Sequence, residues 1–366
     1  MILLFIFFSI IIVIALIKNH QPKINQNNNQ KIYYRSDIFQ PNNSLELALN
    51  NLGYIPGVLE NATLIIPSGY NNIEYELKNI RVVKTNKYIF GIPGCDKLAA
   101  KDSLWQIIET YLGRNTAKKI MPNTYLFNQR GLELFAKDYT PLVCDRYILK
   151  KNIQRKEGIY IASSIKEIMD IYHAGDHGIK DFKIIQEYIK NPLCINDHKL
   201  NLRLYILIIL ENNNLNMYCY KDGKCMYTKQ PYSAESLNFN ETITNFGVSN
   251  ELYQEKNLPL TWKTLQIQNN NHNISPQSIL NLLHNIYHPI NAFFKTPEIS
   301  KNISKFKNIT LFQLFGADVI FRPEATLLEL NKGPEMSFQT QKEKNLKLGV
   351  LTDTLELNLD KFYRVI

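Results

Sequence analysis

The sequence predicts an α+β fold, because strand-like and helix-like segments intermingle without the strict alternation of a parallel α/β sheet. Residues 199–210 and 216–220 have strand patterns on either side of the polar turn ENNN, which favours a hairpin. Residues 310–321 and 326–331 predict a last pair of strands before a closing helix over 343–358. The 366 residues, 45% hydrophobic and 20% charged, suffice for one large domain or several smaller ones.

The first segment, residues 1–18, is an apolar run that we expect to form a membrane anchor. Residues 2–17 contain fifteen apolar residues and one serine. As a helix they would be about 24 Å long, slightly under the roughly 30 Å core of a bilayer. Lysines follow the run, which favours a cytosolic position for the rest of the chain. The sequence therefore predicts a single-pass membrane protein with a polar linker at 19–32.

The remaining expected elements are short and follow no repeat. Five cysteines without a C-x-x-C pair argue against a zinc knuckle or a disulfide framework. The other elements that periodicity predicts are strands at 81–90, 145–150, 158–162 and 181–189, and helices at 103–112, 164–172 and 276–287.

Two segments near the C-terminus carry polar side chains in apolar strands. In TLLELNKGPEM, Glu329 and Asn331 share one face, because successive strand side chains point to opposite faces. Asp318 lies in LFGADVIF, where a buried carboxylate is costly unless it is paired or bound to a metal. A turn after Gly316 is the alternative interpretation of this aspartate. Together the three residues offer the hard oxygen ligands that Mg²⁺ prefers.

Cationic side chains lie upstream on two other predicted strands. In HKLNLRLYILIIL, Lys199, Asn201 and Arg203 share a face, although a solvated sheet face would show the same alternation. Lys150 ends an apolar strand before the loop KNIQRKEG, which is rich in hydrogen-bond donors. Such cations could neutralise the phosphates of a nucleotide whose Mg²⁺ the acidic segment holds. No P-loop or dinucleotide-binding glycine motif is present.

The segment LFGADVIFRPEATLLELNKGPEM resembles the C-terminal signature of the tubulin–tyrosine ligase-like proteins, which are ATP-grasp ligases. Three further segments are similar to family motifs in the same order: YILKKNIQRKEGIYI, IIQEYIKNPLCINDHKLNLRLYILI and TITNFGV. The resemblance covers about residues 88–357. It implies an ATP-grasp fold, preceded by the hydrophobic helix, with N-terminal, central and C-terminal subdomains at 33–141, 142–190 and 191–366.

The resemblance also implies ATP and Mg²⁺ as cofactors and assigns site residues. Asp318, Glu329 and Asn331 are expected to hold the metal, and Arg203 and Lys199 to act on the transferred phosphate. The residues expected at the nucleotide are Lys150, Gly158, Glu187, Tyr188, Ile189, Lys199 and Asn245.

The activity that the resemblance implies is an ATP-dependent ligase joining an amino acid to a protein or peptide carboxylate through an acyl phosphate. A glutamylase-type enzyme is favoured, with an acidic acceptor such as tubulin. The net charge of +9 fits an acidic acceptor. We expect no nucleic-acid partner, because no ladder of aromatic and basic residues is visible.

Three positions depart from the family pattern, and two of them, Asn201 and Met226, favour a second interpretation. Asn201 stands where the family has aspartate, and Glu187 where it has a hinge lysine. Met226 aligns with an arginine that the family associates with the amino-acid substrate. The alternative is a catalytically impaired, membrane-tethered ATP-binding scaffold protein.

Overall fold

The computed structural model describes residues 31–35, 43–67, 73–139, 146–152, 158–174, 182–244, 250–268 and 275–366. Residues Ile32–Ile366 form one structural unit. In the described part of the chain, no helix is both long and apolar enough to cross a bilayer. The predicted membrane location is wrong on this finding, and the expected anchor at 1–18 lies outside the described residues.

Among the described residues, a ten-stranded mixed sheet holds the predicted hairpin and the predicted last strand pair next to each other. Strand β10 (His198–Glu211) pairs with β11 (Asn214–Tyr227) on one side and with β12 (Thr310–Phe321) on the other. Strand β13 (Ala325–Lys332) pairs with β12, and all three pairings are antiparallel. Both hairpin predictions are therefore confirmed, and β10 with β11 extends further than the sequence pattern indicated.

Short strands complete the large sheet, and β12, β4, β3 and β1 pair in parallel. The path of the sheet is β14-β11-β10-β12-β4-β3-β1-β2, with β9 paired to β10. The bounds of these short strands are β1 (Lys31–Arg35), β2 (Tyr54–Pro56), β3 (Leu64–Ile66), β4 (Tyr88–Phe90), β9 (Cys194–Ile195) and β14 (Phe362–Arg364).

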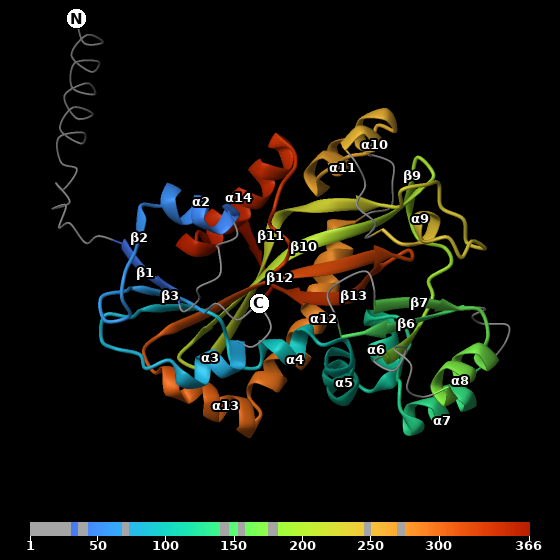
Figure 1. The fold of residues 1–366 in the computed structure, drawn as a ribbon, viewed down its shortest axis with the longest axis horizontal. Helices are drawn as coiled ribbons and strands as arrows, with labels where there is room; N and C mark the ends of the chain where they lie inside the picture. Colours follow the sequence, from blue (N-terminus) through green and yellow to red (C-terminus); the bar gives the residue numbers. More distant parts are fainter. Residues whose placement is uncertain are drawn as a thin grey trace, which may run out of the picture. The chain divides into compact units, whose positions relative to one another are not determined.

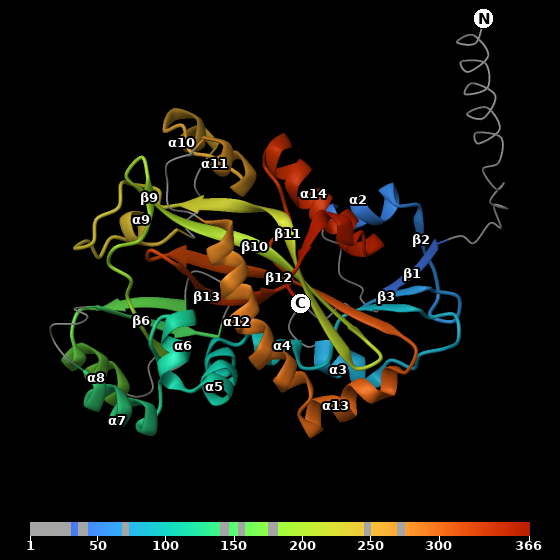
Figure 2. The same cartoon turned by 180° about the vertical axis from the view of Figure 1, so that it is seen from behind.

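Helices cover both faces of the large sheet, and β10 shows how its sequence divides between them. Leu202 and Leu204 belong to the core under helices α5 (Lys101–Leu112) and α12 (Pro276–Phe294). Tyr205 and Leu207 point the other way and pack in a second core with α2 (Asn43–Asn51) and α14 (Gln341–Glu356). Figures 1 and 2 show α12 and α14 on opposite faces of the strands.

A smaller antiparallel sheet has the order β5-β8-β6-β7. Leu132, Phe135 and Ile168 fill the core between this sheet and the two helices that cover one of its faces. In both views β6 and β7 lie beside β13 of the large sheet (Figures 1 and 2). The elements of this layer are β5 (Thr124–Leu126), β6 (Tyr147–Lys151), β7 (Ile159–Ala162), β8 (Phe182–Glu187), α7 (Gln129–Asp138) and α8 (Ile165–His173).

Short helices connect these layers, and one long helix exceeds its predicted length. Helix α12 continues through Pro289, although proline removes a helical hydrogen bond, because buried Ile286, Ile290 and Phe294 pack into the core. The connecting helices are α3 (Ile73–Asn79), α4 (Cys95–Ala99), α6 (Arg114–Ile120), α9 (Phe239–Thr242), α10 (Asn250–Glu255), α11 (Trp262–Gln268), α13 (Pro297–Ile303), η2 (Ser304–Phe306) and η3 (Leu359–Lys361).

Candidate functional site

Three charged side chains stand in register across three adjacent strands. Arg203 on β10 lies opposite Asp318 on β12, which lies opposite Glu329 on β13. The guanidinium of Arg203 holds both oxygens of Asp318: Nε donates to Oδ1, and Nη2 donates to Oδ2 at 2.9 Å. A bidentate pair of this kind fixes the plane of both groups. We call Arg203, Asp318 and Glu329 the charged row.

Gly316 gives the charged row the space it needs. It lies two residues before Asp318 on the same strand, and therefore on the same face. A Cβ at this position would stand 2.8 Å from Cδ of Arg203 and 2.8 Å from Cβ of Pro334. The glycine before the aspartate therefore lets the long arginine side chain lie flat across β12.

Glu329 is held by an amide and by a lysine that the sequence analysis did not single out. Nδ2 of Asn331 donates to its Oε1 at 3.0 Å, which confirms that these two residues share a face. Nζ of Lys101, at the start of α5, lies 3.4 Å from Oε2. Burial opposes ionisation, but Lys101 and Lys150 lower the pKa of Glu329 to about 2. Glu329 is therefore a carboxylate at neutral pH.

The pKa of Asp318 shifts in the opposite direction to that of Glu329, although the carboxylate of Asp318 contacts an arginine. Burial raises the pKa of Asp318 above its ordinary value, and the nearby carboxylate of Glu329 adds to this, while Arg203 works against both. Two facing carboxylates make a site that a divalent cation would stabilise, because the cation removes their mutual repulsion.

Lys150 and Lys199 reach the same region from different sheets. Nζ of Lys150 donates to Oε1 of Gln186 at 2.7 Å, and Nζ of Lys199 donates to the carbonyl of Thr242 at 2.9 Å. Burial lowers the pKa of both lysines to about 8. Each ammonium is thus buried against a neutral oxygen, and an anion bound nearby would stabilise the charge of both.

A pocket that is partly open to solvent lies between the small sheet and the large sheet. Isoleucines and Tyr188 line it together with two lysines and several carboxylates. Its walls are Ile148, Lys150, Ile159, Gln186, Glu187, Tyr188, Ile189, Lys199, Asn201, Ile243, Thr244, Asp318, Ile320, Leu328 and Glu329. The combination suits a ligand with a flat apolar part and a strongly anionic part.

Most of the residues that the sequence indicated line this pocket. Arg203 and Asn331 do not line it themselves but are hydrogen-bonded to Asp318 and Glu329, which do. Gly158 is buried directly before β7 and is not among the lining residues. Asn245 lies outside the described residues, as do the donors expected in the phosphate loop at 154–156. The carboxylate of Glu187 accepts from the backbone of Asn123 at 3.3 Å and lies 3.5 Å from Arg322.

Asn201 is the member of the pocket whose hydrogen bonding is incomplete. Its side chain is buried, and in the described part of the chain its Oδ1 has no hydrogen-bond partner. The residue opposite Asn201 on β11 is Met226, whose side chain has no hydrogen-bond donor. A buried acceptor left without a donor is costly, so this atom fits a pocket that a hydrogen-bonding ligand fills.

Comparisons with known proteins show which family the sequence is similar to. Residues 82–365 match the model of the tubulin-tyrosine ligase family. The human tubulin monoglycylase TTLL3 is 25% identical over 218 residues, covering 57% of this chain and 28% of that protein. The tubulin polyglutamylase ttll-4 of Caenorhabditis elegans is 24% identical over 312 residues, covering 79% of this chain and 48% of that protein.

The tubulin polyglutamylase TTLL7 of Mus musculus is 24% identical over 348 residues, covering 86% of this chain and 36% of that protein. The chain thus spans less than half the length of each of these relatives. Because the family model covers most of the sequence, including every residue of the charged row, the protein belongs to the tubulin-tyrosine ligase family.

Proposed function

We propose that the protein is an ATP-dependent ligase that joins an amino acid to a carboxylate of a protein or peptide. The observation that carries the proposal is the charged row facing a pocket that also holds Lys150 and Lys199. Family membership supports a ligase in general. The ATP-grasp architecture, with the nucleotide between the small and the large sheet, is part of the same proposal, as are the subdomain limits 33–141, 142–190 and 191–366.

The pocket offers a place for each part of MgATP. The adenine would lie against Tyr188, Ile189 and Ile148, where the walls are apolar. The phosphates would lie toward Lys150 and Lys199, whose buried ammonium groups favour an anionic partner. The unpartnered Oδ1 of Asn201 would receive a donor from the ligand.

Asp318, Glu329 and Asn331 are the proposed metal ligands. Two carboxylates and an amide are too few to fill the octahedral shell of Mg²⁺, so phosphate oxygens and water would complete it. Bound Mg²⁺ would neutralise phosphate charge. These donors lie together on neighbouring strands, with Asp318 opposite Glu329 and Asn331 hydrogen-bonded to Glu329.

The chemistry would consist of positioning and charge neutralisation. The pair with Asp318 uses Nε and Nη2 of Arg203 and leaves Nη1 to donate to an oxygen of the transferred phosphoryl group. Lys199 would stabilise the same charge from β10. An acceptor carboxylate would attack the γ-phosphorus of ATP, the bond to the β-phosphate would break, and ADP would leave, giving an acyl phosphate. The amine of the donor amino acid would then attack the acyl carbon, lose a proton and displace inorganic phosphate.

Glutamate or glycine is the proposed donor and tubulin, or another acidic peptide, the proposed acceptor. The relatives named above are tubulin polyglutamylases and a tubulin monoglycylase, which favours these two amino acids. A glutamylase is the first candidate. Asn201 and Met226 are paired across β10 and β11, and Asn201 lines the pocket, so two of the three departures from the family pattern lie next to each other.

The test is incorporation of radiolabelled amino acid into protein. Purified chain, MgATP and tubulin are incubated with glutamate or with glycine, and label in the protein fraction is counted with and without ATP. We expect ATP-dependent incorporation that Arg203→Ala abolishes. Tight binding of MgATP without any incorporation would instead favour an ATP-binding protein that lacks ligase activity, which Asn201 and Met226 make the second candidate.

A further inference from the structure

We propose that Thr124 is a positioning residue for Lys150, acting through the side chain of Gln186. The proposal rests on the nucleotide role proposed for Lys150. Thr124 lies on β5 and stands in register with Gln186 on β8. Lys150 on β6 is in register with Ile184, two residues before Gln186. The three polar side chains therefore follow one another across one face of the small sheet, the face that lines the pocket.

All three side chains are withdrawn from water. Thr124 is fully buried, Gln186 is 1% exposed and Lys150 is 6% exposed. Buried polar groups of this kind are expected to have their hydrogen bonds satisfied by each other, because solvent is not available. The order of donors and acceptors along the chain of bonds can therefore be worked out.

The direction of every bond follows from one carbonyl group. Oγ1 of Thr124 lies 2.7 Å from the carbonyl oxygen of Pro122, which can only accept, so the hydroxyl proton is used there. Toward Gln186 the same oxygen must accept, which places Nε2 of Gln186 at 2.9 Å from it. The remaining atom, Oε1, then faces Nζ of Lys150 at 2.7 Å.

The reverse orientation of the amide would fail at both ends. The amide NH₂ would face the ammonium of Lys150, so that two donors would oppose each other. The amide oxygen would face a hydroxyl whose proton is engaged with Pro122. The hydroxyl of Thr124 therefore selects the orientation in which Gln186 accepts from Lys150.

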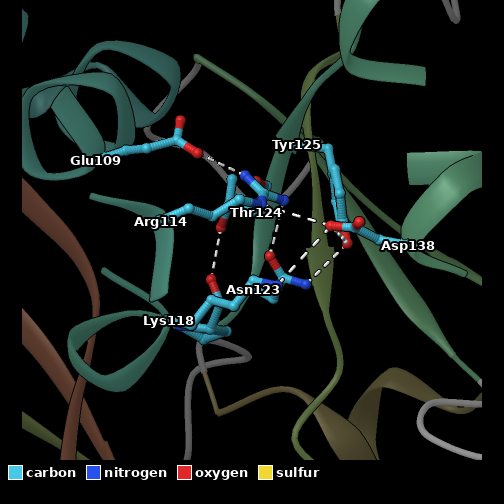
Figure 3. A network of polar contacts seen from close by, with 8 residues as sticks. Glu109, Arg114, Lys118, Asn123, Thr124, Tyr125 and Asp138 are labelled. Atoms are coloured by element: carbon cyan, nitrogen blue, oxygen red, sulfur yellow. Dashed lines mark hydrogen bonds and ion pairs between the residues drawn. The ribbon is translucent and has the colours of Figure 1, made fainter. Parts of the chain in front are cut away.

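A second polar network, around Arg114, holds the backbone of Thr124 in place (Figure 3). Nη1 of Arg114 donates to the carbonyl of Thr124 at 3.2 Å, and Nη2 donates to Oδ1 of Asn123 at 2.9 Å. The guanidinium also bonds Glu109 at 2.6 Å and lies over the ring of Tyr125 at 4.4 Å from its centre. The backbone that carries the hydroxyl is thus fixed to helices α5 and α6.

Charged groups face Lys150 from the other elements around it. Glu329 on β13 and Asp318 on β12 attract its ammonium, while Lys101 on α5 and Lys199 on β10 repel it. These opposing charges act over a distance and do not fix a direction. The bond to Gln186 is directional, and it draws Nζ toward the small sheet rather than toward the proposed metal ligands.

The test compares two substitutions of Thr124. Thr124→Val keeps the shape and removes the hydroxyl, whereas Thr124→Ser keeps the hydroxyl. We expect Thr124→Val to weaken binding of a non-hydrolysable MgATP analogue about tenfold and Thr124→Ser to bind within about twofold of the unchanged protein. Unfolding temperatures of both variants check that the fold persists.

A second measurement does not need nucleotide. Acetylation of Lys150 relative to Lys199 is followed by mass spectrometry in the free protein at pH 8. When the amide of Gln186 turns, the neutral amine of Lys150 is favoured, so the ratio should rise several-fold in Thr124→Val and stay unchanged in Thr124→Ser. Lys199 is the internal reference because its bond to Thr242 is untouched.

The outcomes separate this proposal from the proposed function. If the unchanged protein binds MgATP and Thr124→Val binds it equally well, or if both variants are equally weakened, the positioning role is refuted. If the unchanged protein binds no nucleotide, the proposed function fails, and the acetylation ratio alone supports or refutes the bond chain. An unchanged ratio in Thr124→Val refutes it in either case.

Discussion

Replacing Glu329 by glutamine should weaken nucleotide binding when magnesium is present but not when it is absent. Glutamine keeps the shape and removes the charge that Lys101 and Asn331 hold in place. With Mg²⁺ present, we expect ATP binding to weaken at least about a hundredfold, because a proposed metal ligand is lost. With a chelator present, ATP should bind no more weakly than to the unchanged protein, because a negative charge facing the phosphates is gone.

The same substitution should lower the stability of the fold by an amount that follows from the pKa shift of Glu329. The fall in the pKa of Glu329 from 4.5 to about 2 corresponds to about 3 kcal/mol in favour of the ionised group. Because the pKa is lower in the folded protein, this stabilisation is complete above about pH 4.5 and is lost as the pH falls toward 2. The free energy of unfolding of Glu329→Gln should therefore be about 3 kcal/mol lower at pH 7.

The assay is titration calorimetry with ATP, in magnesium and in chelator, together with urea unfolding from pH 7 downward. Glu298→Gln is the matched control, because Glu298 pairs with Lys97 at 3.2 Å but is 71% exposed. We expect that control to change stability by less than about 1 kcal/mol. If Glu329→Gln binds MgATP as tightly as the unchanged protein, the metal assignment is wrong. A stability change equal to that of the control would refute the electrostatic argument.

Three further changes test other parts of the site. Affinity for MgATP, measured from pH 6.5 to 9.5, should fall above about pH 8, because Lys150 and Lys199 lose their charge as the pH rises through their lowered pKa of about 8. Gly316→Ala should cost about 1–3 kcal/mol of stability in urea unfolding, because its Cβ would overlap the arginine of the charged row. Lys101→Met should weaken MgATP binding about tenfold by removing the cation nearest Glu329, whereas Lys97→Met, on an exposed lysine, should not.

The local pattern of the sequence was enough to predict the strands of the site but not which residues meet across them. Alternation placed Glu329 beside Asn331, and their hydrogen bond at 3.0 Å confirms it. The contact between Arg203 and Asp318 joins residues 115 positions apart and depends on the register of β10 against β12. Register is set by how whole faces pack, so no local signal could have paired these two residues.

Lys101 is a second site residue that the sequence alone could not identify. It starts an ordinary amphipathic helix in a chain with 42 lysines and arginines, and nothing near it in the sequence distinguishes it from the others. Its ion pair with Glu329 arises because α5 packs against the core beneath β13 and begins at the site. A buried lysine becomes visible as functional only when its carboxylate partner is known.

The segment HKLNLRLYILIIL of strand β10 nevertheless indicates where the pocket ends. Along one face of β10 the side chains are polar as far as Arg203 and apolar from Tyr205 onward. Helices α2 and α14 cover the apolar part, and the pocket lies over Lys199 and Asn201 in the polar part. A strand in a sheet covered on both faces is expected to be apolar on both. Where one face of such a strand becomes polar while the other stays apolar, the helices no longer cover the polar part. The change from Arg203 to Tyr205 therefore marks the boundary between the pocket and the core under α2 and α14.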